Sequence, residues 1–134
     1  MQATFKQTAI KVAKEAGKIQ SKYFGKDIKK KTKKDDSFFT KADIESTKKI
    51  RKIILKQFPA HNILCEELGG SNKKSEYRWI VDPLDGTHNF IMNNPLFGVS
   101  IALEYKKEVI LGVIYFPHFD QLYYAEKGKG SFLR

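Results

Sequence analysis

The sequence is poor in cysteine and has no long apolar run. Cys65 is the only cysteine among 134 residues, so the chain cannot form an internal disulfide, and it suits a reducing cytosol. No apolar stretch approaches the ~20 residues of a membrane-spanning helix. The lysine-rich N-terminus also lacks the continuous apolar segment of a secretory signal. We therefore expect a cytoplasmic protein without a membrane partner, in which Cys65 is a buried core thiol.

Acidic residues are also few relative to basic ones. The chain has 15 Asp and Glu against 25 Lys and Arg, which gives a formal net charge of +10. The excess lysines gather at residues 26–34 and 48–56. The first cluster has no interleaved aromatic residues of the kind that stack on nucleic-acid bases. The pattern therefore favours a solvated lysine-rich face that weakly attracts phosphorylated substrates, while RNA or a transcription protein stays open as a partner.

Apolar residues make up 41% of the chain, which is sufficient for a folded core. In the first part of the chain they recur with helical periodicity. Residues 3–24 place apolar side chains on one face, and Gly25 follows as a stop. Residues 44–58 do the same as far as Pro59, and Asp43 precedes them at the position of a helix N-cap. Between these helices we expect a loop or short hairpin at residues 26–36 and a brief extended piece at residues 37–40.

From residue 61 onward the pattern becomes that of strands. Two helices followed by an antiparallel meander predict an α+β fold, in which both helices pack on a largely antiparallel β-sheet. We see no internal repeat and no domain boundary, so residues 1–134 form one unit. Residues 69–72 are expected to be a loop, and the end of the chain resembles the start of a further strand. The expected strands are residues 62–65, 77–81, 97–103, 109–116 and 121–125.

The segment 79–90 carries most of the functional information. An apolar run leads into Asp82 and Asp85, and Gly86-Thr87 follows at once. Paired carboxylates on a rigid support suit a hard cation such as Mg2+, and the Gly-Thr amides could face an anion. Asp-Pro and Asp-Gly are also common turn formers, so a solvated turn stays open as the alternative. A second acid pair, Glu66-Glu67, ends another short apolar run, and acids at two strand ends favour the metal site.

These segments together resemble the inositol monophosphatase family. The acid pair Glu66-Glu67 and the run Trp-Ile-Val-Asp-Pro-Leu-Asp-Gly-Thr at residues 79–87 are similar to the first metal-binding signature of that family. The resemblance continues through residues 97–102, 112–115 and 127–132, and so covers nearly the whole chain. Family members are about twice as long. Their second signature contains a Trp-Asp pair, whereas the only tryptophan here belongs to the first signature.

The resemblance implies that the chain is an N-terminal, metal-binding α+β half of the family fold, with the C-terminal half absent. The complete fold would be a layered αβαβα sandwich, of which this chain forms the first part. The half that the chain lacks would supply a further aspartate to the second metal. It would also supply the groups that recognise the sugar or inositol ring.

The resemblance also implies a set of metal ligands. Glu66, Asp82 and the backbone carbonyl of Leu84 would hold a first Mg2+. Asp82 and Asp85 would hold a second Mg2+, bridged to the first through Asp82, and Glu67 would support the metal-bound waters. Each of these groups presents an oxygen, as Mg2+ prefers.

Further residues are implied to act in catalysis and in phosphate binding. Thr87 would prepare the attacking water together with Glu66 and the first metal. Asp43 would orient Thr87, although a plain helix N-cap is the structural alternative for that residue. The amides of Gly86 and Thr87 would bind the phosphate, and a lysine, best matched by Lys33, would approach the site.

The three histidines receive structural roles. We expect His88 to face the start of a helix or solvent. His61 follows Pro59-Ala60 and His118 follows Pro117, so both are interpreted as loop histidines. None of the three pairs with a nucleophile at a recognisable spacing.

The activity implied by the resemblance is Mg2+-dependent hydrolysis of a phosphate monoester by a metal-activated water. Inositol 1-phosphate or a related sugar phosphate is the expected substrate, and histidinol phosphate stays open. A non-catalytic remnant, or a binding protein for RNA or a transcription protein, is the alternative from a different class. Association of two copies of the chain as a homodimer also stays open.

Overall fold

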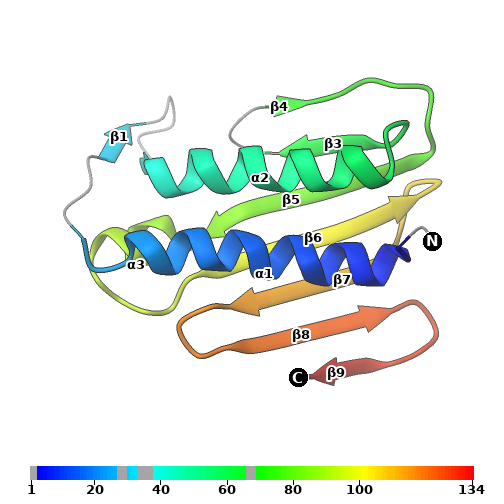
Figure 1. Ribbon diagram of the computed structural model, residues 1–134. Coiled ribbons are helices and arrows are strands. Elements are labelled where there is room, and N and C mark those ends of the chain that lie inside the picture. The colour runs from blue at the N-terminus through cyan, green and yellow to red at the C-terminus, as the bar shows by residue number, and fades with distance from the viewer. Residues whose placement is uncertain (1–2, 27–29, 33–37, 66–68) are drawn as a thin grey trace.

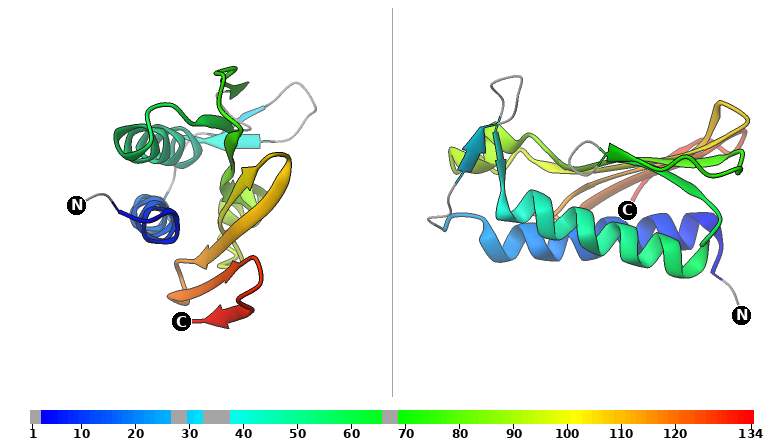
Figure 2. Two further views of the ribbon diagram at one scale, coloured as in Figure 1. Left: turned by 90° about the vertical axis from the view of Figure 1, so that its right-hand side faces the viewer. Right: turned by 90° about the horizontal axis from the view of Figure 1, so that it is seen from above.

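The computed structural model describes residues 3–26, 30–32, 38–65 and 69–134. It consists of a seven-stranded sheet, two long helices that lie on one face of that sheet, a short third helix and a separate two-stranded hairpin (Figures 1 and 2). This arrangement confirms the predicted α+β fold. Within the described residues, no helix is both long and apolar enough to cross a membrane.

The first helix, α1 (Phe5–Tyr23), begins at a capping box. The Thr4 hydroxyl accepts a hydrogen bond from the Gln7 amide at 3.1 Å, and the Gln7 side chain accepts one from the Thr4 amide at 2.9 Å. These two bonds satisfy donors that the first turn of a helix leaves unpaired. The buried face of α1 is lined by small residues, among them Ala9, Val12 and Ala13, which allow the helix to lie close to the sheet.

The second helix, α2 (Lys41–Gln57), begins differently from the prediction. Its N-cap is Thr40, and Asp43 occupies the third helical position, where its carboxylate accepts a hydrogen bond from the Thr40 amide at 2.7 Å. The prediction of Asp43 as the N-cap is therefore wrong by three residues. Its physical reason is the capping box, in which an acidic residue reaches back to the preceding cap. Because Asp43 is one turn inside the helix, its side chain is fully buried.

The seven strands of the large sheet lie in the order β4-β3-β5-β6-β7-β8-β9. All neighbouring pairs are antiparallel except β3 and β5, which are parallel. The bounds are β3 (Asn62–Cys65), β4 (Gly69–Gly70), β5 (Tyr77–Asp85), β6 (Gly98–Tyr105), β7 (Glu108–Phe116), β8 (Gln121–Glu126) and β9 (Ser131–Leu133). The five predicted strands are confirmed, with β5 extending four residues further than expected.

Two details of the sheet differ from the prediction. The parallel pair β3–β5 breaks the expected antiparallel meander, and residues 69–70, predicted as loop, pair with the end of β3 as β4. A parallel pair requires the chain to return to the starting end before the second strand begins. Residues 71–76 make that return, and the Asn62 side chain holds them by accepting a hydrogen bond from the Lys73 amide at 2.6 Å.

The main core lies between the helices and the sheet. Trp79 and alternate residues of β6 and β7 are buried against α1 and α2, and Cys65 is buried in the same cluster, as predicted. Gly17 permits the close approach of α1 to β7, since a side chain there would lie 2.5 Å from the Tyr115 ring. A second, smaller core cluster consists of Ala42, Leu84, Phe90 and Phe97. It joins the start of α2 to the end of β5, and so fixes these two segments to each other.

The segment between the long helices contains β1 (Lys30–Thr32) and β2 (Phe38–Thr40), which pair antiparallel. The extended piece expected at residues 37–40 is confirmed for residues 38–40, and its partner in the hairpin is residues 30–32. Residues 27–29 and 33–37 lie outside the described residues. The short helix α3 (Thr87–Ile91) follows β5 directly. It lies beside the hairpin at one end of the molecule (Figure 1).

Candidate functional site

A β-bulge brings the two aspartates of the first motif to one face of the sheet. Asp82 pairs with Ser100 on β6, and Asp85 pairs with Gly98, so three steps along β5 match two steps along β6. In a regular strand, residues three apart point to opposite faces. The extra residue of the bulge cancels that alternation, because Ser100 and Gly98 are two apart and share a face. Asp82 and Asp85 therefore lie on the same side of the sheet.

The two residues inside the bulge are anchored from the helical side. The Gln20 side-chain amide of α1 donates a hydrogen bond to the Pro83 carbonyl, and Gln20 is fully buried. Leu84 is also buried, in the small core cluster next to Phe97. A proline in a strand interior is tolerated at a bulge, where the ladder hydrogen bond is already broken. Gln20 was missed by the sequence analysis, and a polar residue on the apolar face of a predicted helix was the only available signal.

Gly86 makes the turn from the bulge into α3. Its φ of 85° and ψ of 38° are in the left-handed region, and a side chain there would lie 2.9 Å from the Leu96 carbonyl oxygen. Both features require glycine. The turn places Thr87 at the first position of α3, directly after the two aspartates.

Thr87 and Asp43 meet across 44 residues of sequence. Oγ1 of Thr87 lies 3.1 Å from Oδ1 of Asp43 and 3.1 Å from the Leu84 carbonyl oxygen, so its single proton has two acceptors. The other carboxylate oxygen of Asp43 accepts hydrogen bonds from the amide and the hydroxyl of Thr40, at 2.7 and 2.8 Å. Asp43 therefore belongs to the capping box of α2 and also contacts Thr87, while its role in orienting Thr87 for catalysis stays a prediction.

The end of β3 lies beside the beginning of the bulge. Cys65 pairs in parallel with Val81, the residue before Asp82. Its sulfur lies 3.8 Å from the Thr47 hydroxyl, which donates at 2.8 Å to the Asp43 carbonyl. Glu66 and Glu67 follow Cys65 in sequence, but they lie outside the described residues, as does Lys33.

The described part of the site offers hard oxygen donors. Asp82, Asp85 and the Leu84 carbonyl are close in sequence and gathered by one bulge, and this donor chemistry suits Mg2+. Among the described residues, no three His, Cys, Asp or Glu side chains are close enough together to hold a metal. A small cavity of about 200 Å³ adjoins Asp85 and Gly86, and its lining includes Asn89, Gly98 and Ser100.

The histidines lie away from this cluster. His88 is exposed on α3 and His118 is exposed in the β7–β8 turn, as predicted. His61 lies in the loop before β3, as predicted, but it is buried and stacked between the rings of Phe58 and Tyr77, with centroid distances of 4.8 and 4.6 Å. The Trp79 indole N–H donates to its Nδ1 at 3.0 Å. Burial, together with the nearby Lys73 charge, lowers the pKa of His61 below its usual 6.5.

Comparison with known proteins assigns this arrangement to a family. The model of the inositol monophosphatase family matches residues 1–134. The chain is 42% identical over 121 residues to a fructose-1,6-bisphosphatase/inositol-1-monophosphatase of Aquifex aeolicus, covering 87% of this chain and 45% of that protein. It is 41% identical over 128 residues to a histidinol-phosphatase of Chlorobaculum parvum, covering 95% of this chain and 49% of that protein.

The fold agrees with that assignment. The extragenic suppressor protein suhB of Bartonella henselae superposes with a TM-score of 0.94 and 34% identity, over 98% of this chain and 52% of that one. The chain thus spans about half the length of the relatives that it matches. The expectation that it forms part of the inositol monophosphatase fold is confirmed, and the chain belongs to the inositol monophosphatase family.

Proposed function

We propose that the protein takes part in Mg2+-dependent hydrolysis of a phosphate monoester, with inositol 1-phosphate or a related sugar phosphate as the substrate. The observation that carries the proposal is the position of Thr87. Its hydroxyl is held by the buried Asp43 at 3.1 Å, directly after the bulge that gathers Asp82 and Asp85 on one face. Residues 1–134 would be the metal-binding part of the complete fold.

The metal would be held by oxygen donors from two neighbouring strand ends. Asp82, Asp85 and the Leu84 carbonyl come from β5, and Glu66 is next in sequence after Cys65 of the parallel strand β3. Glu67 would support the waters of the metal. When bound, Mg2+ supplies Lewis-acid polarisation and lowers the pKa of a coordinated water.

Thr87 and Asp43 would orient the attacking water. The Thr87 proton has its acceptors on Asp43 and Leu84, so the lone pairs of Oγ1 are left to accept a hydrogen bond from water. A water that donates to Thr87 has its own lone pair directed elsewhere, as an attack on phosphorus requires. Asp43 is thus a positioning residue, because it acts through Thr87.

The amides of Gly86 and Thr87 would bind the phosphate. Gly86 is in the left-handed conformation and α3 begins immediately after it, so successive N–H groups turn toward one side. Lys33 would add a positive charge near the ester. The net charge of +10 would favour the approach of any anionic substrate.

The test is phosphate release from inositol 1-phosphate by the 134-residue chain, with and without millimolar Mg2+. Turnover that depends on Mg2+ and is lost in Asp82→Asn supports the proposal. The matched control is Asp120→Asn, which makes the same chemical change in the β7–β8 turn and should leave the rate unaltered. Turnover that is equal with and without Mg2+ would contradict it.

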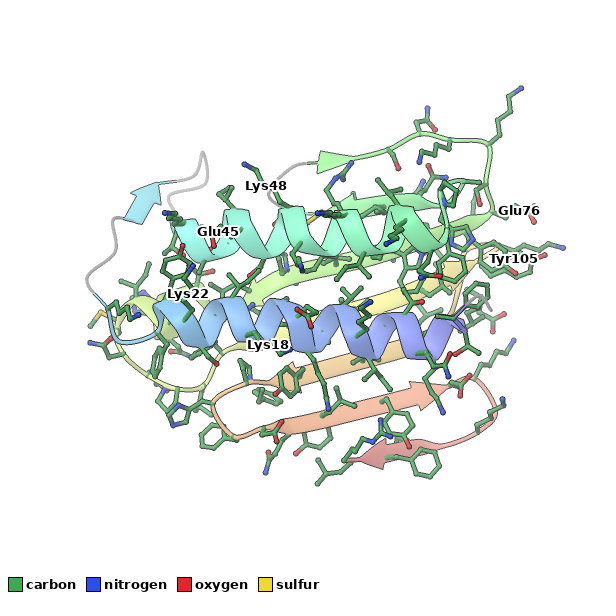
Figure 3. The ribbon with its side chains drawn as sticks, in the orientation of Figure 1. Lys18, Lys22, Glu45, Lys48, Glu76 and Tyr105 are labelled. Atoms are coloured by element: carbon green, nitrogen blue, oxygen red, sulfur yellow. The ribbon has the colours of Figure 1, made fainter. Side chains whose placement is uncertain are left out.

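A second candidate function is binding of RNA without catalysis. Eight exposed lysines, four on each long helix, favour this function. The same two helices carry few acidic residues that would offset the positive charge. Figure 3 shows Lys18 and Lys22 along α1 and Lys48 on α2, on the helical side of the molecule. Binding of this kind weakens steeply with salt, so a mobility shift measured at two salt concentrations tests it. The exposed lysines are Lys11, Lys14, Lys18, Lys22, Lys41, Lys48, Lys52 and Lys56.

A further inference from the structure

Gln20 is an unusual residue on the buried face of α1. Its side chain is fully buried, although glutamine is mostly found at protein surfaces. The side-chain amide donates to the Pro83 carbonyl of β5, a contact across 63 residues of sequence. Within the described residues, Oε1 of the same side chain is buried and has no hydrogen-bond partner. An unsatisfied buried oxygen disfavours folding, so packing alone does not account for a glutamine at this position.

The Pro83 carbonyl belongs to the bulge that gathers the two aspartates of the candidate site. Pro83 and Leu84 lie between two paired positions of β5 and β6, where the regular ladder is interrupted. The Pro83 carbonyl accepts its hydrogen bond from Gln20, and the Leu84 carbonyl oxygen lies 3.1 Å from the Thr87 hydroxyl. The two peptide groups that flank Leu84 therefore each have a side-chain partner, one from α1 and one from α3.

The helix α1 is held in place on either side of Gln20. Three residues earlier, Gly17 lets the helix approach β7, since a side chain there would lie 2.5 Å from the Tyr115 ring. Three residues later, the Tyr23 hydroxyl donates to a carboxylate oxygen of Glu45 at 2.6 Å, which joins α1 to α2. This end of α1 lies at the same end of the molecule as α3 (Figure 1). Gln20 therefore reaches the bulge from a part of the helix whose position is fixed.

We propose that Gln20 is a positioning residue of the candidate metal site. By holding the Pro83 carbonyl, its amide fixes the bulge that turns Asp82 and Asp85 to one face. It also fixes the peptide group next to the Leu84 carbonyl, the third candidate ligand of this segment. Groups that orient metal ligands commonly change metal affinity by about 10–100-fold. The metal-binding part of the proposal rests on the proposed Mg2+-dependent function, whereas the anchoring of the bulge is testable without a metal.

The first test measures the bulge in the 134-residue chain without metal. Gln20→Met keeps the length of the side chain and removes both the donor and the unsatisfied oxygen. The midpoint of urea unfolding should stay near that of the parent chain, because a hydrogen bond and an unsatisfied acceptor are lost together. Amides of residues 84–87 should nevertheless exchange with solvent about fivefold faster, the effect of one lost hydrogen bond on local opening. A purely structural role predicts the reverse, a lower midpoint with unchanged exchange at the bulge.

The second test is calorimetric titration of the same chains with Mg2+. Gln20→Met should weaken Mg2+ binding by about tenfold or more. Gln121→Met makes the same chemical change at the exposed start of β8, and should match the parent chain in both tests. Gln20→Leu is the second variant, in case Gln20→Met fails to fold by circular dichroism.

The combined results distinguish the role of Gln20 from the proposed function. Faster exchange together with weaker Mg2+ binding supports Gln20 as a positioning residue. Unchanged exchange at residues 84–87, or a Mg2+ affinity equal to that of a parent chain that binds the metal, overturns that role. If the parent chain itself gives no Mg2+ signal while Gln20→Met still exchanges faster, the anchoring of the bulge is supported and the metal-dependent function is the part that fails.

Discussion

The hydroxyl of Thr87 lies 3.1 Å from Oδ1 of Asp43, and this contact joins the start of α3 to the first turn of α2. Asp43 is fully buried and also accepts two hydrogen bonds from Thr40. One carboxylate therefore stabilises a helix start and holds a candidate catalytic hydroxyl. Its orientation is set by the cap, so Thr87 has a fixed partner before any ligand binds.

The Asp43–Thr87 contact should be measurable as a coupling free energy. Asp43→Ala should lower the free energy of unfolding by about 2 kcal/mol or more, because a cap and buried hydrogen bonds are lost together. Thr87→Val removes the hydroxyl at nearly constant volume. In a double-mutant cycle measured by urea unfolding, we expect a coupling of about 1 kcal/mol. Additive effects of the two substitutions would show that the contact contributes nothing to stability.

Asp82 should be required for Mg2+ binding. Removing the charge of one carboxylate that shares a cation weakens an oxygen site strongly, so Asp82→Asn should abolish the calorimetric signal for Mg2+. Asp120 is the matched control because it lies in the β7–β8 turn, away from β5, and its φ of 49° is tolerated by asparagine. If Asp82→Asn and Asp120→Asn titrate alike, Asp82 is not a ligand.

Gly86 should be the least replaceable of three glycines. Gly86→Ala combines a left-handed φ of 85° with an approach of 2.9 Å to the Leu96 carbonyl, and should cost about 1–3 kcal/mol. Gly128→Ala shares a positive φ of 77° but meets no described atom, so it isolates the backbone effect.

Gly112→Ala has neither problem and should stabilise the strand by about 0.5–1 kcal/mol. Thermal unfolding of the three variants measures the order of their stabilities. A Gly86→Ala variant as stable as Gly128→Ala would mean that the turn adjusts to the side chain.

His61 should make the fold sensitive to acid. Its folded pKa is lowered below 6.5, so the unfolded state binds the proton more readily. The contribution of His61 to the free energy of unfolding is complete above pH 6.5. It is lost as the pH falls from 6.5 toward the folded pKa, by up to about 1.4 kcal/mol per pH unit. The physical reason is that burial disfavours the charged imidazolium, and the nearby Lys73 charge adds to that effect on the pKa of His61.

The measurement is urea unfolding followed by the fluorescence of Trp79, the single tryptophan, between pH 5 and pH 7.5. His61→Phe should flatten the pH dependence in this range. His118→Gln removes an exposed histidine and should leave the pH dependence of stability as in the parent chain. An unchanged slope in His61→Phe would assign the acid sensitivity to other groups.

Much of the fold could be predicted from local pattern. The apolar spacing of residues 3–24 predicts α1, and the alternation over residues 97–103 predicts β6, because both periods depend on neighbours a few residues away. The candidate metal motif was also visible, since Asp82 and Asp85 with Gly86 form one short string. By contrast, the cap of α2 was placed at Asp43 in place of Thr40, because both residue types cap helices and only the backbone distinguishes them.

By itself, the sequence determined the helices, most strands, the buried Cys65 and the residues available for chemistry. Only the tertiary structure decided how these residues meet. The register of β5 against β6 creates the bulge that turns Asp82 and Asp85 to one face, and packing of α1 brings Gln20 to the Pro83 carbonyl. The parallel pairing of β3 with β5, and the hydrogen bond from the Trp79 indole to the buried His61, are equally non-local. Such contacts depend on strand register and helix docking across long separations, which no local pattern of residues encodes.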